Sequence, residues 1–210
     1  MLERTRPVLD AGYIELLDLM GDESRIVKAA RITTQTQGQP ESDRRLLERL
    51  LRDGHNTVFE PVHMSWQVRC PIFVARQWMR HRIGTFNERS LRYTTIGDED
   101  TYYNPFPSDS PLAYQWDLQM QSQFATYGSL LNSGVRPEVA RGVLGTALYT
   151  EFMWTVDLWS WTNWYRKRCA PSAQAEHREY AQASLDLLGE KMPVFAQALL
   201  RIDSAAAACS

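Results

Sequence analysis

The segment His63-Met-Ser-Trp-Gln-Val-Arg-Cys70 alternates between apolar and polar residues, and Pro71 follows it directly. The alternation places Met64, Trp66, Val68 and Cys70 on one face of a predicted β-strand. Pro71 ends this strand and also suits the first turn of a helix, which we predict from Ile72 to about His81. The chain therefore passes directly from a half-buried strand into a helix.

Similar patterns on both sides of this segment predict further elements. Before it, the sequence indicates a strand over Gly12–Met20, a helix from Asp22 or Ser24 to Ala30, and a helix from a Ser42 cap to Asp53. After it come an extended or loop stretch (84–93), a Pro-rich connection (104–111), a helix (about 112–132), a short helix opening at Arg136-Pro137, a buried strand (147–156), and helices over about 158–168 and 173–200. Because strands and helices mix without regular β-α-β alternation, we predict one α+β domain over residues 1–210, with a mostly antiparallel sheet flanked by helices. Residues 203–210 are expected to be a frayed tail.

Composition sets the broad class of protein. The chain has 210 residues, 44% hydrophobic and 23% charged, which is typical of one globular domain with a sizeable core. No apolar run reaches the roughly 18 residues that span a bilayer, and the first residues lack the apolar stretch of a signal peptide, so we expect a cytoplasmic protein without a membrane partner. The spacing of the three cysteines, Cys70, Cys169 and Cys209, indicates free thiols. The spacing of the four histidines, His55, His63, His81 and His177, predicts no metal site.

Charge is concentrated in one segment. The net charge is only −2, which gives no reason to expect a nucleic-acid polymer as partner. Between Arg76 and Arg92, however, five arginines face a single acid, Glu88. This segment therefore predicts a site for a small anion.

Two groups in this segment could bind a nucleotide. Arg80-His81-Arg82 lies where the predicted helix meets a glycine-containing loop, so its guanidinium groups could bond a phosphate, or could form a solvated basic helix end. In an extended chain Glu88, Ser90 and Arg92 would share one face, as a nucleotide site or as the polar face of an edge strand. No Gly-x-Ser-x-Gly elbow surrounds Ser90, which favours binding over nucleophilic catalysis. The sequence contains neither a Rossmann fingerprint nor a P-loop.

The stretch RHRIGTFNERSLRY, residues 80–93, resembles the signature of flavin-dependent thymidylate synthases. Flanking stretches extend the resemblance from about Gly12 to about Ala181: Ala30-Arg31-Ile32-Thr33, His55-Asn-Thr57-Val-Phe-Glu60, Pro71-Ile-Phe-Val-Ala-Arg-Gln77-Trp, Glu138-Val-Ala-Arg141, and Leu148-Tyr-Thr150 through Trp154-Thr155.

The resemblance implies an α+β fold and a homotetramer whose active sites form between subunits. It also implies FAD held without a Rossmann domain, NADPH as the reductant of FAD, and 5,10-methylenetetrahydrofolate as the carbon donor that converts dUMP to dTMP. The hydride comes from the flavin, tetrahydrofolate is released, and no cysteine nucleophile is needed.

The resemblance also assigns site residues by position. Residues similar to the family's flavin contacts are Thr57, Glu60, Arg80, His81, Arg82, Ile83, Glu88 and Asn163. Those similar to its dUMP contacts, which different subunits could supply, are Gln77, Arg80, Glu88, Ser90, Arg92, Arg141 and Arg168. Arg168 matches the arginine beside the pyrimidine, where a cation would stabilise negative charge developing on the ring, and it is the predicted catalytic residue.

Asp157-Leu-Trp159 departs from the family, which often has Asn-x-Arg there against FAD. Asp157 could cap the following helix, and Trp159 could stack on the flavin or only pack. His177 is expected on a helix surface. A nonenzymatic nucleotide- or RNA-binding domain, or a flavoprotein reductase with another substrate, are the competing interpretations of the chain.

Overall fold

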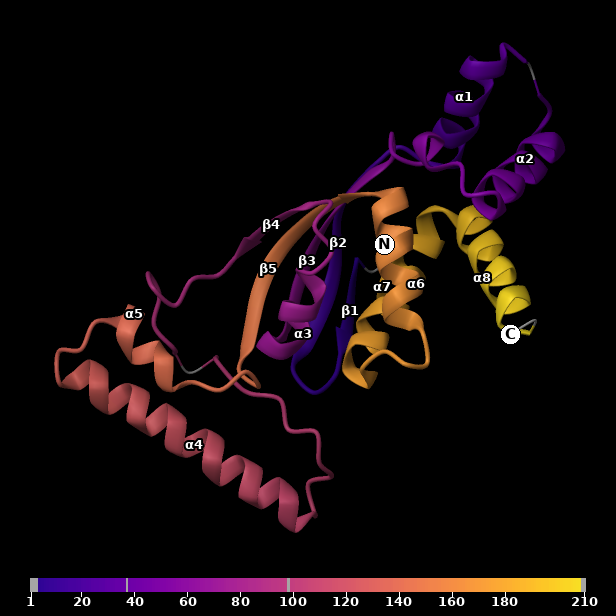
Figure 1. Cartoon of the computed structure of the whole chain (residues 1–210). Helices are drawn as coiled ribbons and strands as arrows, with labels where there is room; N and C mark the ends of the chain where they lie inside the picture. The colour runs from indigo at the N-terminus through magenta and orange to yellow at the C-terminus, as the bar shows by residue number, and fades with distance from the viewer. Residues whose placement is uncertain (1–3, 37, 98, 209–210) are drawn as a thin grey trace.

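A five-stranded antiparallel sheet lies at the centre of the computed structural model, which describes residues 4–36, 38–97 and 99–208 (Figure 1). Its strand order is β1-β2-β3-β5-β4, with bounds Thr5–Val8, Gly12–Met20, His63–Pro71, Tyr149–Asp157 and Thr85–Glu88. The three long strands confirm the predictions for those segments. β1 was not predicted, because it has four residues and contains Pro7, a residue that is mostly confined to edge strands.

The apolar positions of neighbouring strands lie opposite one another on one face of the sheet. Trp66 of β3 pairs with Leu16 of β2 and with Trp154 of β5, and all three are buried. The helices α6 (Leu158–Cys169) and α7 (Ala175–Lys191) cover this face with further aromatic side chains, among them Trp164 and Tyr180. Each buried indole removes roughly 200 Å² from water, which contributes on the order of 5 kcal/mol before entropy costs. Packing of these side chains therefore fixes the register of the sheet.

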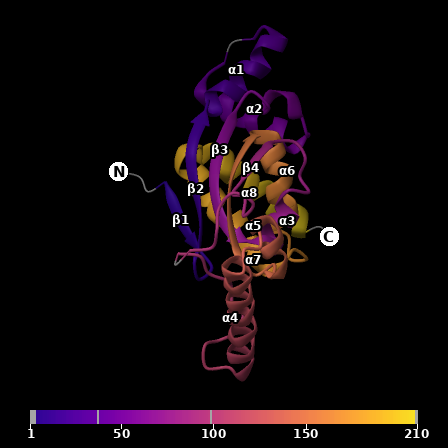
Figure 2. The same ribbon diagram turned by 90° about the vertical axis from the view of Figure 1, so that its left-hand side faces the viewer.

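The helices at one end of the sheet project beyond it (Figures 1 and 2). They are α1 (Glu23–Thr34), capped by Asp22 as one of the two predicted caps, α2 (Pro40–Arg52) and the short 3-10 helix η1 (Asn56–Val58). The predicted Ser42 cap is wrong, since α2 begins earlier and is capped at Gln39. Ser42 lies three residues into the helix, where its Oγ accepts a hydrogen bond from the Gln39 backbone N–H at 3.0 Å.

The predicted helix over residues 173–200 is in fact two helices. α7 ends at Lys191, and α8 runs from Pro193 to Ala208. Met192 leaves the helical conformation because a residue before proline is hindered there and proline cannot continue the hydrogen-bond ladder. α8 includes residues 203–208 of the predicted frayed tail, while residues 209–210, including Cys209, lie outside the described residues.

Helix α3 (Ile72–Trp78) is shorter than predicted. It ends before Arg80 and His81, which lie in the turn that leads to β4. Gly84 permits this path: its φ is +139°, and a Cβ there would lie 2.8 Å from Nε1 of Trp154. Arg80-His81-Arg82 therefore lies after the helix, in the connection to β4, and does not form the last turn of the helix.

Helix α4 (Pro111–Asn132) stands apart from the sheet in both views (Figures 1 and 2). The residue before the Pro-rich connection helps to hold it: Nε1 of Trp116 donates to the Tyr103 carbonyl at 2.9 Å. Leu112, Tyr114 and Leu118 nevertheless remain exposed on α4. The helix leads to α5 (Pro137–Ala140), which confirms the predicted short helix, and to the 3-10 helix η2 (Arg141–Val143).

No helix among the described residues combines the length and apolarity that crossing a membrane requires. The two described cysteines, Cys70 and Cys169, are free thiols.

Candidate active site

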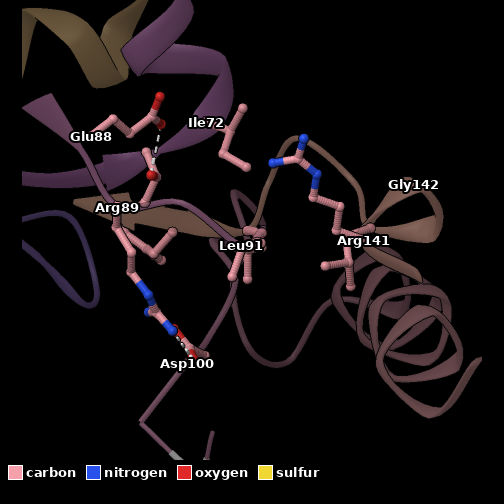
Figure 3. A pocket seen from close by; sticks show the side chains of 11 residues that line it. Ile72, Glu88, Arg89, Leu91, Asp100, Arg141 and Gly142 are labelled. Atoms are coloured by element: carbon pink, nitrogen blue, oxygen red, sulfur yellow. Dashed lines mark hydrogen bonds and ion pairs between the residues drawn. The ribbon is translucent and has the colours of Figure 1, made fainter. Parts of the chain in front are cut away.

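A cavity of about 290 Å³ lies where β4 and β5 meet the turn after β4 and the 3-10 helix η2 (Figure 3). Its charged lining comes from Glu88, Arg89, Asp100 and Arg141, and Ile72 is part of its apolar wall. Glu88 and Arg141 are more than 50 positions apart in the sequence. The fold thus brings together two of the predicted nucleotide contacts.

Glu88 lines this cavity and is held by Thr150. The Thr150 hydroxyl donates a hydrogen bond to Oε1 of Glu88 at 2.7 Å. Glu88 pairs with Phe152 across the β4–β5 ladder, so Thr150 is its diagonal neighbour on the same face. This contact fixes one carboxylate oxygen and leaves the other to accept a hydrogen bond from a ligand. The sequence contained Thr150 among the family matches, but no pattern linked it to Glu88.

Of the two alternatives for this stretch, the loop holds beyond Glu88, so Glu88, Ser90 and Arg92 do not share the face of an extended chain. Strand β4 ends at Glu88, and Ser90 opens a turn in which its carbonyl accepts from the backbone N–H groups of Tyr93 and Thr94 at 3.0 and 3.1 Å. The Ser90 hydroxyl accepts from the Arg92 N–H at 3.3 Å, a local bond that competes with a strand. Arg92 is turned toward Glu138, with which it forms an ion pair at 2.9 Å.

Arg141 presents an unused cation to the cavity. It begins η2, and its side chain extends toward Ile72 (Figure 3). Within the described residues its guanidinium makes no hydrogen bond or ion pair. An arginine in this state is suited to bidentate binding of a phosphate or carboxylate.

A second cluster forms where the ends of α3 and α6 meet. The Arg168 guanidinium donates to the Gln77 carbonyl at 2.6 Å, to Oε1 of Gln77 at 3.4 Å and to Nε2 of His81 at 3.1 Å. Burial, together with the charges of Arg168 and Lys167, lowers the pKa of His81 to about 4. His81 is therefore neutral at physiological pH and can act as an acceptor. Three predicted residues are thus brought together, and one of them, Arg168, is a half-buried cation that contacts the other two.

His177 lies beside this cluster and contradicts the expectation of a surface residue. It is fully buried, and its ring stacks on Trp78 with centroids 5.1 Å apart. Burial, followed by the charges of Arg168 and His81, lowers the pKa of His177 to about 3. The ring is therefore a neutral part of the core, which helical spacing alone did not reveal.

A cleft of about 670 Å³ between α1, α2 and η1 contains Thr57, a predicted flavin contact. His55 and Arg31, which were not among the predicted site residues, also line it. Neither this cleft nor the cavity beside β4 is lined by Gln77, His81 or Arg168. The remaining predicted flavin contacts lie exposed: Glu60 after η1, Arg80, Arg82 and Ile83 in the turn after α3, and Asn163 on α6.

Asp157 and Trp159 both have structural roles. The Asp157 carboxylate accepts from the Ser160 N–H at 2.8 Å and caps α6, which confirms the capping interpretation. The Trp159 ring stacks on Phe59 with centroids 5.8 Å apart, as expected for packing. The two residues that depart from the family pattern therefore cap and pack the start of α6, and no arginine is present there.

The chain is similar to known proteins of one family. Residues 15–194 match the family model described as thymidylate synthase complementing protein. The chain is 38% identical to the flavin-dependent thymidylate synthase of Thermosipho africanus, over 92% of this chain and 93% of that protein. It is 39% identical to the enzyme of the same name from Thermotoga neapolitana, over 93% and 94% of the two chains.

A solved structure shares the whole architecture. The UMP/dUMP methylase PolB from Streptomyces cacaoi, bound with 5-Br dUMP, superimposes with a TM-score of 0.83 at 26% identity, over 93% of this chain and 97% of that chain. Matches of this length and identity, together with the clustered signature residues, show that the chain belongs to the family of flavin-dependent thymidylate synthases.

Proposed function

We propose that the protein methylates dUMP to dTMP, with FAD as flavin, NADPH as reductant and 5,10-methylenetetrahydrofolate as carbon donor. The observation that carries the proposal is the cavity in which Glu88 and Arg141 meet in a chain of this family. One basic and one acidic group in a small concave site suit a nucleotide, with Arg141 on its phosphate and Glu88 accepting from its sugar or base.

Arg168 acts on the pyrimidine. A half-buried guanidinium fixed by the Gln77 carbonyl and a neutral His81 keeps its charge, because arginine does not deprotonate in proteins. It would stabilise negative charge on the ring without reorganising, which is the usual source of large electrostatic effects.

The exposed residues around the turn after α3 suit a flavin dinucleotide. Within the described residues, the side chains of Arg80 and Arg82 make no hydrogen bond or ion pair, so both can bond a pyrophosphate. Thr57 adds a hydroxyl in the α1–α2 cleft. When bound, the reduced flavin supplies the hydride that completes the methyl group.

The described cysteines do not suit a nucleophilic mechanism. Cys70 is fully buried, and burial, followed by the charge of Glu88, raises the pKa of its thiol well above the usual value. Cys169 packs against the core. Neither lines the cavity beside β4, which favours a flavin-dependent route over attack by a thiolate.

The active site is proposed to form between subunits of a homotetramer. In one chain, the cavity with Glu88 and Arg141 and the cleft with Thr57 share no lining residue, and Arg168 lines neither of them. Contacts between subunits would also cover the exposed apolar residues of α4.

UMP is a second candidate substrate, because the structural neighbour is a UMP/dUMP methylase. The test is to incubate the FAD-loaded protein anaerobically with NADPH, methylenetetrahydrofolate and either dUMP or UMP, and to separate the nucleotides by chromatography. We expect dTMP from dUMP. Methylated UMP alone would replace the proposed substrate, and NADPH oxidation without a methylated product would indicate a reductase.

A further inference from the structure

The segment that follows β4 begins and ends on the same strand. The Arg89 N–H donates to the Glu151 carbonyl at 2.9 Å, and the Tyr149 N–H donates to the Thr101 carbonyl at 3.0 Å. Glu151 and Tyr149 are two positions apart on β5. The segment therefore leaves β5 and returns beside its starting point, with Ser90 and Arg92 between the two attachments.

An ion pair joins the two ends of this segment. The terminal nitrogens of Arg89 bond both carboxylate oxygens of Asp100, with Nη2 to Oδ2 at 2.9 Å (Figure 3). The Asp100 side chain is 9% exposed and that of Arg89 is 35% exposed, so solvent screens the pair in part. Oδ2 of Asp100 also accepts from the Gly97 N–H at 2.9 Å, which links the pair to the backbone of the segment.

The remaining donors of Arg89 point into the same segment. Nη2 donates to the Thr95 carbonyl at 3.0 Å and Nε to the Thr94 hydroxyl at 3.3 Å. That hydroxyl in turn donates to the Ser90 carbonyl at 3.1 Å. Although Arg89 lines the cavity, its hydrogen-bonding groups are thus directed to its own segment, unlike those of Arg141.

We propose that the Arg89–Asp100 ion pair positions the turn that begins at Ser90 and contains Arg92, two of the predicted nucleotide contacts. Arg89 is then a positioning residue and not a ligand of the nucleotide. The pair holds the backbone that carries Ser90 and Arg92, which follows Glu88 directly. The identity of the nucleotide rests on the proposed function, whereas the holding of the segment does not.

The alternative is that Arg89 binds the phosphate directly and that Asp100 only occupies it in the free protein. Asp100→Ala separates the two ideas. If Arg89 is a ligand, removing Asp100 frees a cation beside the cavity and leaves dUMP binding equal or tighter. If the pair positions the turn, the same change weakens binding.

The first measurement is hydrogen–deuterium exchange of residues 90–97 in the nucleotide-free protein. We expect Asp100→Ala to accelerate exchange about tenfold, and Asp100→Asn about threefold, because the amide keeps an acceptor but loses the charge. Glu41→Ala is the control, since it removes the exposed Arg45–Glu41 pair of α2. Unchanged exchange in Asp100→Ala would overturn the proposal.

The second measurement is dUMP affinity by calorimetry, with FAD content measured in parallel. We expect Asp100→Ala to raise the Kd about tenfold at unchanged FAD content, and Asp100→Asn to recover part of the loss. Equal or tighter binding by Asp100→Ala would overturn the proposal. If the wild type binds no dUMP, the proposed substrate is wrong and the exchange result alone decides. Should Asp100→Ala not fold, Asp100→Asn and Arg89→Lys serve for both measurements.

Discussion

Single residues explain how the Arg168 cluster holds a cation at a fixed place. Gln77 contributes a backbone carbonyl, which does not depend on side-chain rotation, and His81 contributes a ring nitrogen that stays neutral. The function of Arg168 therefore requires both its charge and the two acceptors that orient it.

We predict that Arg168→Ala lowers the rate of dTMP formation by about 100-fold or more, the typical cost of removing one preorganised electrostatic group. Flavin reduction by NADPH without dUMP should persist, which stopped-flow absorbance can follow. Arg166→Ala is the control, because Arg166 lies on the same helix but pairs with Asp203 at 3.0 Å. Near-wild-type dTMP formation by Arg168→Ala would show that the assignment is wrong.

His177 predicts a pH dependence of stability. The unfolded chain takes up a proton near pH 6.5, whereas the folded chain does so only near the lowered pKa of about 3. The free energy of unfolding should therefore fall as the pH drops from about 6.5 toward 3, by up to about 1.4 kcal/mol per pH unit from this residue.

Urea unfolding of His177→Phe at several pH values checks this. Between about pH 3 and 6.5, the slope of the free energy of unfolding against pH should be smaller than in wild type, by an amount that corresponds to about one proton. Tyr180→Phe serves as control: it removes a neighbouring buried hydroxyl whose pKa is raised by burial, so it should destabilise without changing the slope. An identical slope in His177→Phe and wild type would rule out this role of the ring.

At the scale of elements, the long strands were predictable because His63–Pro71 alternates, Gly12–Met20 alternates in part, and Tyr149–Asp157 is largely apolar and buried. Strand β4 was predicted only as part of an extended or loop stretch, since its four residues, Thr85–Glu88, are mostly exposed and depend on pairing with β5. The early end of α3 also follows from tertiary structure, because Gly84 must approach β5 closely. Short elements that depend on a distant partner leave little trace in the local sequence.

Gly84→Ala should disturb the turn and β4 together. Its φ of +139° is unfavourable for alanine, and the added Cβ would lie 3.0 Å from the Thr155 carbonyl. We expect a loss of about 1–3 kcal/mol in the free energy of unfolding, measured with urea, and weaker FAD binding. Gly128→Ala on α4, where nothing lies within 4 Å of the new Cβ, is the control and should be neutral or slightly stabilising. Equal stability of the two variants would contradict the packing argument.

At the scale of the whole molecule, the exposed side chains of α4 bear on assembly. Tyr114 and Leu118 are one helical turn apart, and they are 66% and 49% exposed. We predict a tetramer by size-exclusion chromatography with light scattering, and smaller species for Leu118→Asp, because a buried unpaired charge would destabilise the interface. Gln119→Asp, on an exposed neighbouring position, should leave assembly unchanged. A monomeric wild type would contradict a site formed between subunits.

The sequence predicted the family and the α+β architecture, but only part of the arrangement of the site. The resemblance selected Gln77, His81 and Arg168, and the fold does bring them together. It did not reveal the contact of Thr150 with Glu88 or that of Asp100 with Arg89, because each joins residues whose proximity depends on how the chain folds back against β5. Partners of site residues are therefore less predictable than the site residues themselves.

The source of the hydride tests the proposed function most directly. The protein would be incubated anaerobically with FAD, NADPH, dUMP and methylenetetrahydrofolate that carries deuterium at C6, and the products would be analysed by mass spectrometry. A flavin hydride predicts dTMP without deuterium, release of tetrahydrofolate, and no dTMP when FAD is omitted. Deuterated dTMP accompanied by dihydrofolate, or dTMP formed equally well without flavin, would contradict the proposed function.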